Sequence, residues 1–160
     1  MNLGEDGRNT GKLAEALDLY RAAESIYRKL GDQRSTARAR RLAALVMCDQ
    51  GDATGARALL EKSVADFMRA GDDKDLCEAL YGLAYAYSLS DPRRASMLWG
   101  AGQRSRDMRG VRAAPPDANR ESHEITAARA ALGDETAFDL AWQQGAAMSL
   151  AQAAHFALQS

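Results

Sequence analysis

The chain has 160 residues, of which 46% are hydrophobic and 27% are charged, and its formal net charge at pH 7 is −1. This composition is typical of one globular domain that is long enough to bury a core. A net charge near zero excludes a general electrostatic attraction to nucleic acid or to an acidic membrane surface. No apolar run approaches the roughly 20 residues that span a bilayer, and residues 1–10 lack the pattern of a secretory signal. We therefore expect a soluble, cytoplasmic protein.

The first two thirds of the chain repeat with a period of about 40 residues. Gly11 and Gly31 bracket one segment, Gly51 and Gly71 bracket the next, and a third copy covers about residues 91–110. Apolar or small residues recur at matching places inside these segments: Ala16, Leu19, Tyr20, Ala23 and Tyr27, then Ala56, Leu59, Leu60, Ser63 and Phe67, then Ala95, Leu98, Trp99 and Gly102. A period of this length indicates a helical solenoid, in which each unit buries its apolar face against its neighbours.

Helix-forming residues dominate these repeats, and Gly-Asp pairs divide them. The sequence predicts helices over residues 12–30, 33–50, 53–70, 74–89 and 92–109. Each glycine of a Gly-Asp pair is expected to end a helix in the left-handed conformation, and each aspartate to cap the next helix. The fold class is therefore all-α, an antiparallel helix-hairpin solenoid that occupies residues 1–110.

A different pattern follows the repeats. Residues 111–118, which contain Pro115-Pro116, are predicted to be a linker. Three shorter helices are expected after it: one to about Leu132, one that carries Phe138, and one that starts after Ser149, where Ser-Leu-Ala-Gln matches a capping box. Because the terminal units of solenoids are usually atypical, residues 119–160 are interpreted as a helical cap packed on the repeats.

The first repeat is expected to be truncated, because Leu3-Gly4 matches Ala43-Ala44 one period later. In this interpretation Gly11 is a turn between a partial helix and the helix over residues 12–30. The apolar face of that helix would be only partly covered, and such faces tend to bind a partner. A homodimer is therefore expected, and a self-assembling scaffold or a fragment with no ligand of its own is the alternative to an interaction module. The predicted dimer face consists of Leu13, Tyr20 and Tyr27.

The sequence also predicts a partner-binding groove. In such helical stacks the first helix of each pair lines the concave side, so residues on one face of these helices are the candidates. The predicted groove comprises Arg34, Arg38 and Arg41 on the helix over residues 33–50, and Lys74, Glu78, Tyr81 and Tyr85 on the helix over residues 74–89. Arginines beside tyrosines suit an acidic peptide or a C-terminal carboxylate. A solvated helix face is the simpler alternative. Nucleic acid fits least, because the basic patch is short.

No catalytic, cofactor or metal site is predicted, so the chain is expected not to be an enzyme. Gly7 to Leu13 only loosely matches a phosphate-binding loop, because three residues instead of four separate the glycines and Leu13 replaces the required Ser or Thr. His123 and His155 have no partner at metal-ligand spacing, and Ser122 points away from His123 on a helix. An enzyme with an unrecognised site around either histidine is the remaining alternative.

The cysteines and the large aromatic residues are assigned structural roles. Cys48 and Cys77 are expected too far apart along parallel helices for a disulfide, and they lack the histidines of a zinc site, so both are predicted to be free thiols. Trp99, Trp142 and Phe138 are predicted to pack between helices.

The spacing resembles that of tetratricopeptide repeats, lengthened from the usual 34 residues to about 40. The sequence of residues 19–72, LYRAAESIYRKLGD to MRAGD, resembles the variant in large bacterial regulators. Residues 95–110, ASMLWGAGQRSRDMRG, and residues 127–158, AARAALGDETAFDLAWQQGAAMSLAQAAHFAL, resemble the C-terminal end of the repeat region in bacterial signal-transduction ATPases, many of them LuxR-type transcriptional regulators.

This resemblance covers nearly the whole chain and implies a limited role. In that group an ATPase domain precedes the repeats and a helix-turn-helix DNA-binding domain often follows them, but the motifs of both are absent here. What the resemblance implies is sensing or docking: the repeats would bind a protein or a small effector on the concave face and pass that state to attached domains. Direct nucleic-acid binding by this segment is not expected.

Overall fold

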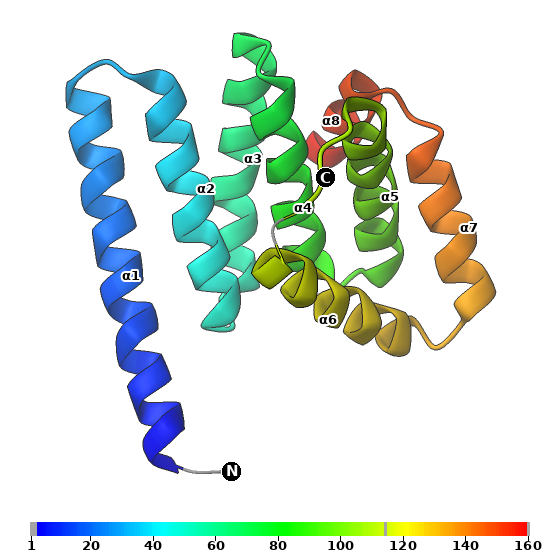
Figure 1. Ribbon diagram of the computed structural model, residues 1–160, viewed down its shortest axis with the longest axis horizontal. Helices are drawn as coiled ribbons and strands as arrows, with labels where there is room; N and C mark the ends of the chain where they lie inside the picture. Colours follow the sequence, from blue (N-terminus) through cyan, green and yellow to red (C-terminus); the bar gives the residue numbers. More distant parts are fainter. Residues whose placement is uncertain (1–2, 114, 160) are drawn as a thin grey trace.

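The computed structural model describes residues 3–113 and 115–159. Within these residues the chain is all-helical, with eight α-helices and no strand. The helices are α1 (Leu3–Lys29), α2 (Gln33–Asp49), α3 (Ala53–Ala70), α4 (Asp73–Tyr87), α5 (Pro92–Arg109), α6 (Pro115–Leu132), α7 (Glu135–Ala146) and α8 (Leu150–Leu158). Figure 1 shows α1 to α5 as a row of hairpins, which confirms the predicted helix-hairpin solenoid. None of the described helices has the length and hydropathy of a membrane-spanning segment.

The order of helices changes after α5. Each helix from α1 to α5 packs against the next one along the chain, but the neighbour that packs most extensively against α5 is α7 and not α6. Figure 1 shows α6 crossing the row obliquely instead, with α7 at the end of the row. The last helix, α8, packs against α3, α4 and α5. The C-terminal helices thus contact the repeats directly.

The Gly-Asp turns form as the sequence predicts. The glycines of the three Gly-Asp pairs in the repeats have positive φ angles: Gly31 at 75°, Gly51 at 87° and Gly71 at 66°. The aspartate that follows each glycine accepts a hydrogen bond from a backbone N–H three residues later: Asp32 from Ser35, Asp52 from Gly55, and Asp72 from Asp75. This capping chemistry satisfies the free N–H groups of the next helix and fixes the hairpin geometry.

The core extends from α2 to α5, and α8 and Phe138 of α7 complete it. Its largest fully buried side chains include Trp99, Phe67 and Phe138, as expected for aromatic residues at helical spacing. Trp142 is half-buried, and its ring centroid lies 6.4 Å from that of Phe138. The predicted packing role of these aromatic residues is confirmed.

Two glycines allow α5 and α7 to touch backbone to backbone. A Cβ built on Gly145 would overlap the carbonyl group of Met97, and a Cβ built on Gly100 would overlap the carbonyl group of Trp142. Beside this crossing, the Ser96 hydroxyl donates a hydrogen bond to the carbonyl oxygen of Phe138 at 2.8 Å. The crossing fixes α7 tightly on the last repeat.

Two predicted boundaries are wrong. Gly11 lies inside α1, which runs without a break from Leu3 to Lys29. Lys12, not a capping aspartate, follows this glycine, and a lone glycine inside a helix is tolerated at about 1 kcal/mol. The other correction concerns α6, which begins at Pro115, within the predicted linker. Proline has no N–H to lose in the first turn of a helix, so it begins this helix instead of preventing it.

Candidate functional site

The structure divides the seven predicted groove residues into two groups. Four of them, Arg41 on α2 and Glu78, Tyr81 and Tyr85 on α4, line one narrow space of about 20 Å³. The opposite wall of this space belongs to α6, through Arg120, Glu121 and Glu124. Figure 1 shows α6 passing across α4 in this region. The concave face that the sequence assigned to a partner is therefore covered in part by a helix of the same chain.

The other three residues lie near the N-terminal ends of α2 and α4. Arg34 forms an ion pair with Asp72, and Arg38 forms one with the buried carboxylate of Asp75. Lys74 is exposed. Because Asp72 and Asp75 come from the start of α4, these ion pairs join neighbouring repeats, and they reduce the positive charge available to a partner.

Arg106 on α5 is the central cation of the concave face, and sequence reasoning missed it. Its guanidinium carbon lies 3.6 Å from the centre of the Tyr81 ring, and its nitrogens contact Glu78 at 3.0 Å and Glu121 at 2.8 Å. Burial opposes its charge, but the hydrogen bond to Glu121 and the nearby negative groups outweigh burial, so the pKa of Arg106 is raised. The spacing of the sequence could have indicated that Arg106 is buried, because it follows Trp99 and Gly102 at helical intervals on the buried stripe of α5.

Two charged side chains beneath the N-terminal half of α6, Arg41 and Glu124, are buried with incomplete hydrogen bonding among the described residues. The Arg41 Nε atom is buried without a hydrogen-bond partner among the described residues, and burial lowers its pKa. Glu124 Oε1 lies 3.4 Å from Arg120 Nε. Burial, together with the negative charges of Glu121 and Asp49, raises the pKa of Glu124 to about 7. This half of α6 therefore rests on a polar layer and not on an apolar core.

The C-terminal half of α6 is attached differently. Ala128 is fully buried, and Ile125 and Leu132 pack against the hydrophobic core. The Arg129 guanidinium also lies 4.5 Å from the centre of the Phe138 ring and pairs with Asp139 at 2.8 Å. Apolar packing thus anchors one half of α6, whereas charge pairs hold the other half over the groove.

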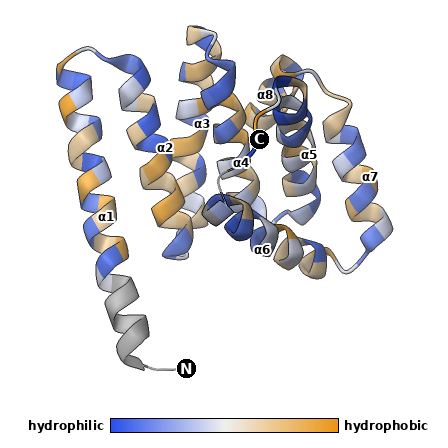
Figure 2. Ribbon diagram, viewed as in Figure 1, coloured by the Kyte–Doolittle hydropathy of each residue, from blue (hydrophilic) through white to orange (hydrophobic). Residues whose placement is uncertain are grey.

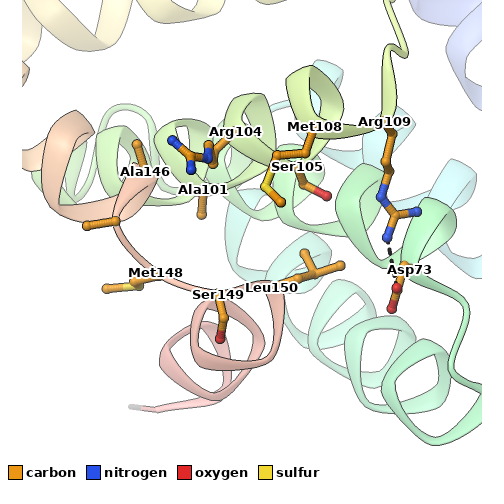
Figure 3. Close-up of a pocket in the computed structure, with 11 residues that line it drawn as sticks. Asp73, Ala101, Arg104, Ser105, Met108, Arg109, Ala146, Met148, Ser149 and Leu150 are labelled. Carbon is orange, nitrogen blue, oxygen red and sulfur yellow. Dashed lines mark ion pairs between the residues drawn. The ribbon is translucent and has the colours of Figure 1, made fainter.

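A separate cavity of about 620 Å³ lies between α5 and the α7–α8 connection. Figure 3 shows Met108, Met148 and Leu150 around it, with Arg104 at its edge. Its remaining polar groups have structural partners: Arg109 pairs with Asp73 at 2.8 Å, and the Ser149 hydroxyl caps α8. The cavity therefore has room for an apolar side chain or a small molecule, but it presents no nucleophile with an adjacent base.

The predicted dimer face also needs correction. Leu13 and Tyr20 are half-buried and pack against the core on the α2 side of α1, so they are not a free surface. Of the three predicted residues only Tyr27 is exposed. The large apolar residues that are most exposed in this region are instead Leu19, Ile26 and Leu30. The apolar face of α1 that is open to a partner is thus adjacent to the predicted one.

The remaining candidates for chemistry form no recognisable site among the described residues. His123, His155 and Ser122 are exposed on separate parts of α6 and α8, and no group of His, Cys, Asp or Glu among the described residues has metal-binding geometry. Cys48 and Cys77 are free thiols, as predicted. Burial raises the pKa of Cys48 to about 12 and that of Cys77 to about 11, which keeps both protonated.

Comparison with known proteins agrees with the repeat architecture. A tetratricopeptide repeat family model matches residues 1–65, which contain α1, α2 and most of α3. Neither the comparison with curated proteins nor that with solved structures gives a significant match. Repeats of this family generally mediate protein–protein interaction and are generally non-enzymatic. The match over residues 1–65 supports a tetratricopeptide-like repeat region in this part of the chain.

Proposed function

We propose that this chain is a non-enzymatic protein-interaction module whose concave face, formed by α2 and α4, binds an acidic helical segment. The observation that carries the proposal is the position of α6, which places Glu121 on Arg106 and Glu124 in the space lined by Arg41. A helix that presents two carboxylates, Glu121 and Glu124, already lies where an acidic partner was expected. Arginine and tyrosine side chains together supply the charge-assisted hydrogen bonds and the flat apolar surfaces that such a segment needs.

A partner segment would take the place of the N-terminal half of α6. This half is held by buried charges, and two of these side chains, Arg41 and Glu124, each have a buried atom with no hydrogen-bond partner among the described residues. The desolvation of such groups offsets much of their attraction. The C-terminal half keeps its apolar anchor at Ala128. A partner whose carboxylates satisfy Arg41 as well as Arg106 would therefore displace the first turns of α6 without unfolding the cap.

The test uses a labelled synthetic peptide of residues 115–132 as the acidic probe. Fluorescence anisotropy compares its binding to the full chain and to a Glu121→Lys/Glu124→Lys variant, in which repulsion from Arg106 and Arg41 opens the groove. We expect the variant to bind the peptide roughly tenfold more tightly than the native chain, which corresponds to about 1.4 kcal/mol. A peptide with glutamine at positions 121 and 124 is the matched control and should lose this binding. Equal binding of both peptides, or no gain in the variant, would refute the proposal, with circular dichroism confirming that the variant is folded.

We further propose that the module acts as the repeat region of a signal-transduction ATPase regulator of transcription and passes its bound state to attached domains in the cytoplasm. The support is the resemblance of residues 127–158 to the closing segment of that region. Direct binding of nucleic acid is not part of this role, since the net charge is −1 and most arginines of the concave face pair with carboxylates. Gel-shift measurements with duplex DNA should show no complex, and a complex at moderate salt would contradict the assignment.

A further inference from the structure

An apolar stripe runs along the outer side of α1 and lacks a partner among the described residues. Leu19 and Ile26 of α1 are 70% and 57% exposed, Ala23 lies between them, and Leu30, the first residue after the helix, is 73% exposed. The spacings of four, three and four residues are those of the a and d positions of a heptad. Figure 2 shows hydrophobic residues along α1 although this helix stands at the edge of the row. An exposed stripe with this spacing is suited to packing against another helix.

The equivalent face of α3 shows how such a helix is placed. One 40-residue period after Ala23 and Ile26 come Ser63 and Asp66 on α3. The Ser63 hydroxyl donates a hydrogen bond to the carbonyl oxygen of Ala37 on α2 at 3.1 Å, and Asp66 pairs with Arg40 of α2 at 2.7 Å. The helix α2, which is antiparallel to α3 within the hairpin, thus covers this face of α3. On α1 the same face is open and more apolar, so an antiparallel helix is the expected occupant.

The charges beside the stripe favour a second copy of α1 as that helix. In the heptad frame the flanking g positions are Glu15, Ala22 and Lys29, all of them exposed. In an antiparallel pair the g positions of the two helices face each other. A two-fold axis next to Ala22 places Glu15 of each protomer opposite Lys29 of its partner and brings the two small Ala22 side chains together. The seam is therefore self-complementary, as an isologous interface requires.

We propose that two copies of this chain form a two-fold symmetric dimer in which their α1 helices pack antiparallel through Leu19, Ala23 and Ile26. In this dimer the α1 helix of the partner takes the place on α1 that α2 takes on α3. The proposed seam uses none of the concave-groove residues, because it lies on α1, and α2 is the helix against which α1 packs most extensively. The dimer and the proposed acidic-segment binding are thus independent of each other.

Sedimentation velocity of the full chain over a range of concentrations tests the proposal. We expect a monomer–dimer equilibrium that Ile26→Asp abolishes, because the substitution buries a charge in the seam. Leu140→Asp on α7 is the matched control, since Leu140 is 55% exposed and lies away from α1, and it should leave the dimer intact. A native chain that stays monomeric at the highest concentration would overturn the proposal, as would a dimer that tolerates Ile26→Asp.

A charge swap tests the antiparallel register. Glu15→Lys and Lys29→Glu should each raise the dimer dissociation constant roughly tenfold, because each creates two like-charge pairs across the two-fold axis. The Glu15→Lys/Lys29→Glu double variant restores both ion pairs and should return the constant to near its native value. A double variant that is weaker than either single variant would refute this register. Thermal unfolding followed by circular dichroism shows that all the variants remain folded.

Discussion

The backbone contact between α5 and α7 predicts a large penalty for one added methyl group. In Gly145→Ala the new Cβ overlaps the carbonyl group of Met97, which is part of a helix backbone and cannot rotate away. Overpacking of this kind lowers the free energy of unfolding by up to about 3 kcal/mol. The greater helix propensity of alanine raises it by about 1 kcal/mol. The expected net loss is therefore about 2 kcal/mol. For a domain of this size that loss lowers the Tm by about 4–8 °C.

Gly11→Ala is the matched control for this prediction. Gly11 also lies inside a helix, but nothing lies within 4 Å of a Cβ built on it. The substitution should therefore stabilise the chain by up to about 1 kcal/mol and raise the Tm by about 2–4 °C. Differential scanning calorimetry of the two variants and the native chain measures both shifts. If Gly145→Ala is as stable as the native chain, the close crossing of α5 and α7 is wrong.

Three further predictions concern buried polar groups. Arg106→Met leaves two carboxylates without their cation, and urea denaturation should show a loss of about 3–5 kcal/mol; a loss below about 1 kcal/mol would contradict the ion-pair cluster. The pKa of Glu124 is raised from 4.5 to about 7 in the folded chain, so the folded state holds this proton more tightly than the unfolded state. Its contribution to stability is then present below about pH 4.5 and lost as the pH rises to about 7, and Glu124→Gln should flatten the dependence of Tm on pH in this window. Finally, Cys48 and Cys77 should react with a thiol reagent at pH 8 only after unfolding, because burial raises the pKa of each thiol; rapid reaction of the native chain would refute that burial.

Local chemistry explains why so much of the repeat region was predictable. A glycine that takes a positive φ and an aspartate that caps the next helix lie within a few residues of each other, so Gly31-Asp32 and Gly71-Asp72 mark their turns without any tertiary information. The buried stripe of α3 is likewise visible as helical periodicity. Gly11 occupies the same place in the repeat as the turn glycines, but its next residue, Lys12, cannot cap a helix, so α1 continues through it.

The groove was less predictable because its chemistry depends on pairs distant in sequence. Arg38 meets a carboxylate at Asp75, and Arg106 meets one at Glu121 on the oblique helix α6. Periodicity places each arginine on a face, but it does not say which carboxylate another helix brings to that face. Four of the seven predicted residues do line one space, but the charge that this space presents depends on where α6 lies.

The position of α6 follows from the crossing of α5 and α7. Because Gly100 and Gly145 let α7 pack directly on α5, α7 takes the place in the row that the next helix along the chain would otherwise fill. The 18 residues of α6, a helix about 27 Å long, must then run outside the row between the end of α5 and the start of α7. The residues of α6 lie on the concave face, where Glu121 forms an ion pair with Arg106. Two glycines remote from the groove thus determine what covers it, so a loosened α5–α7 crossing should also change binding at the concave face.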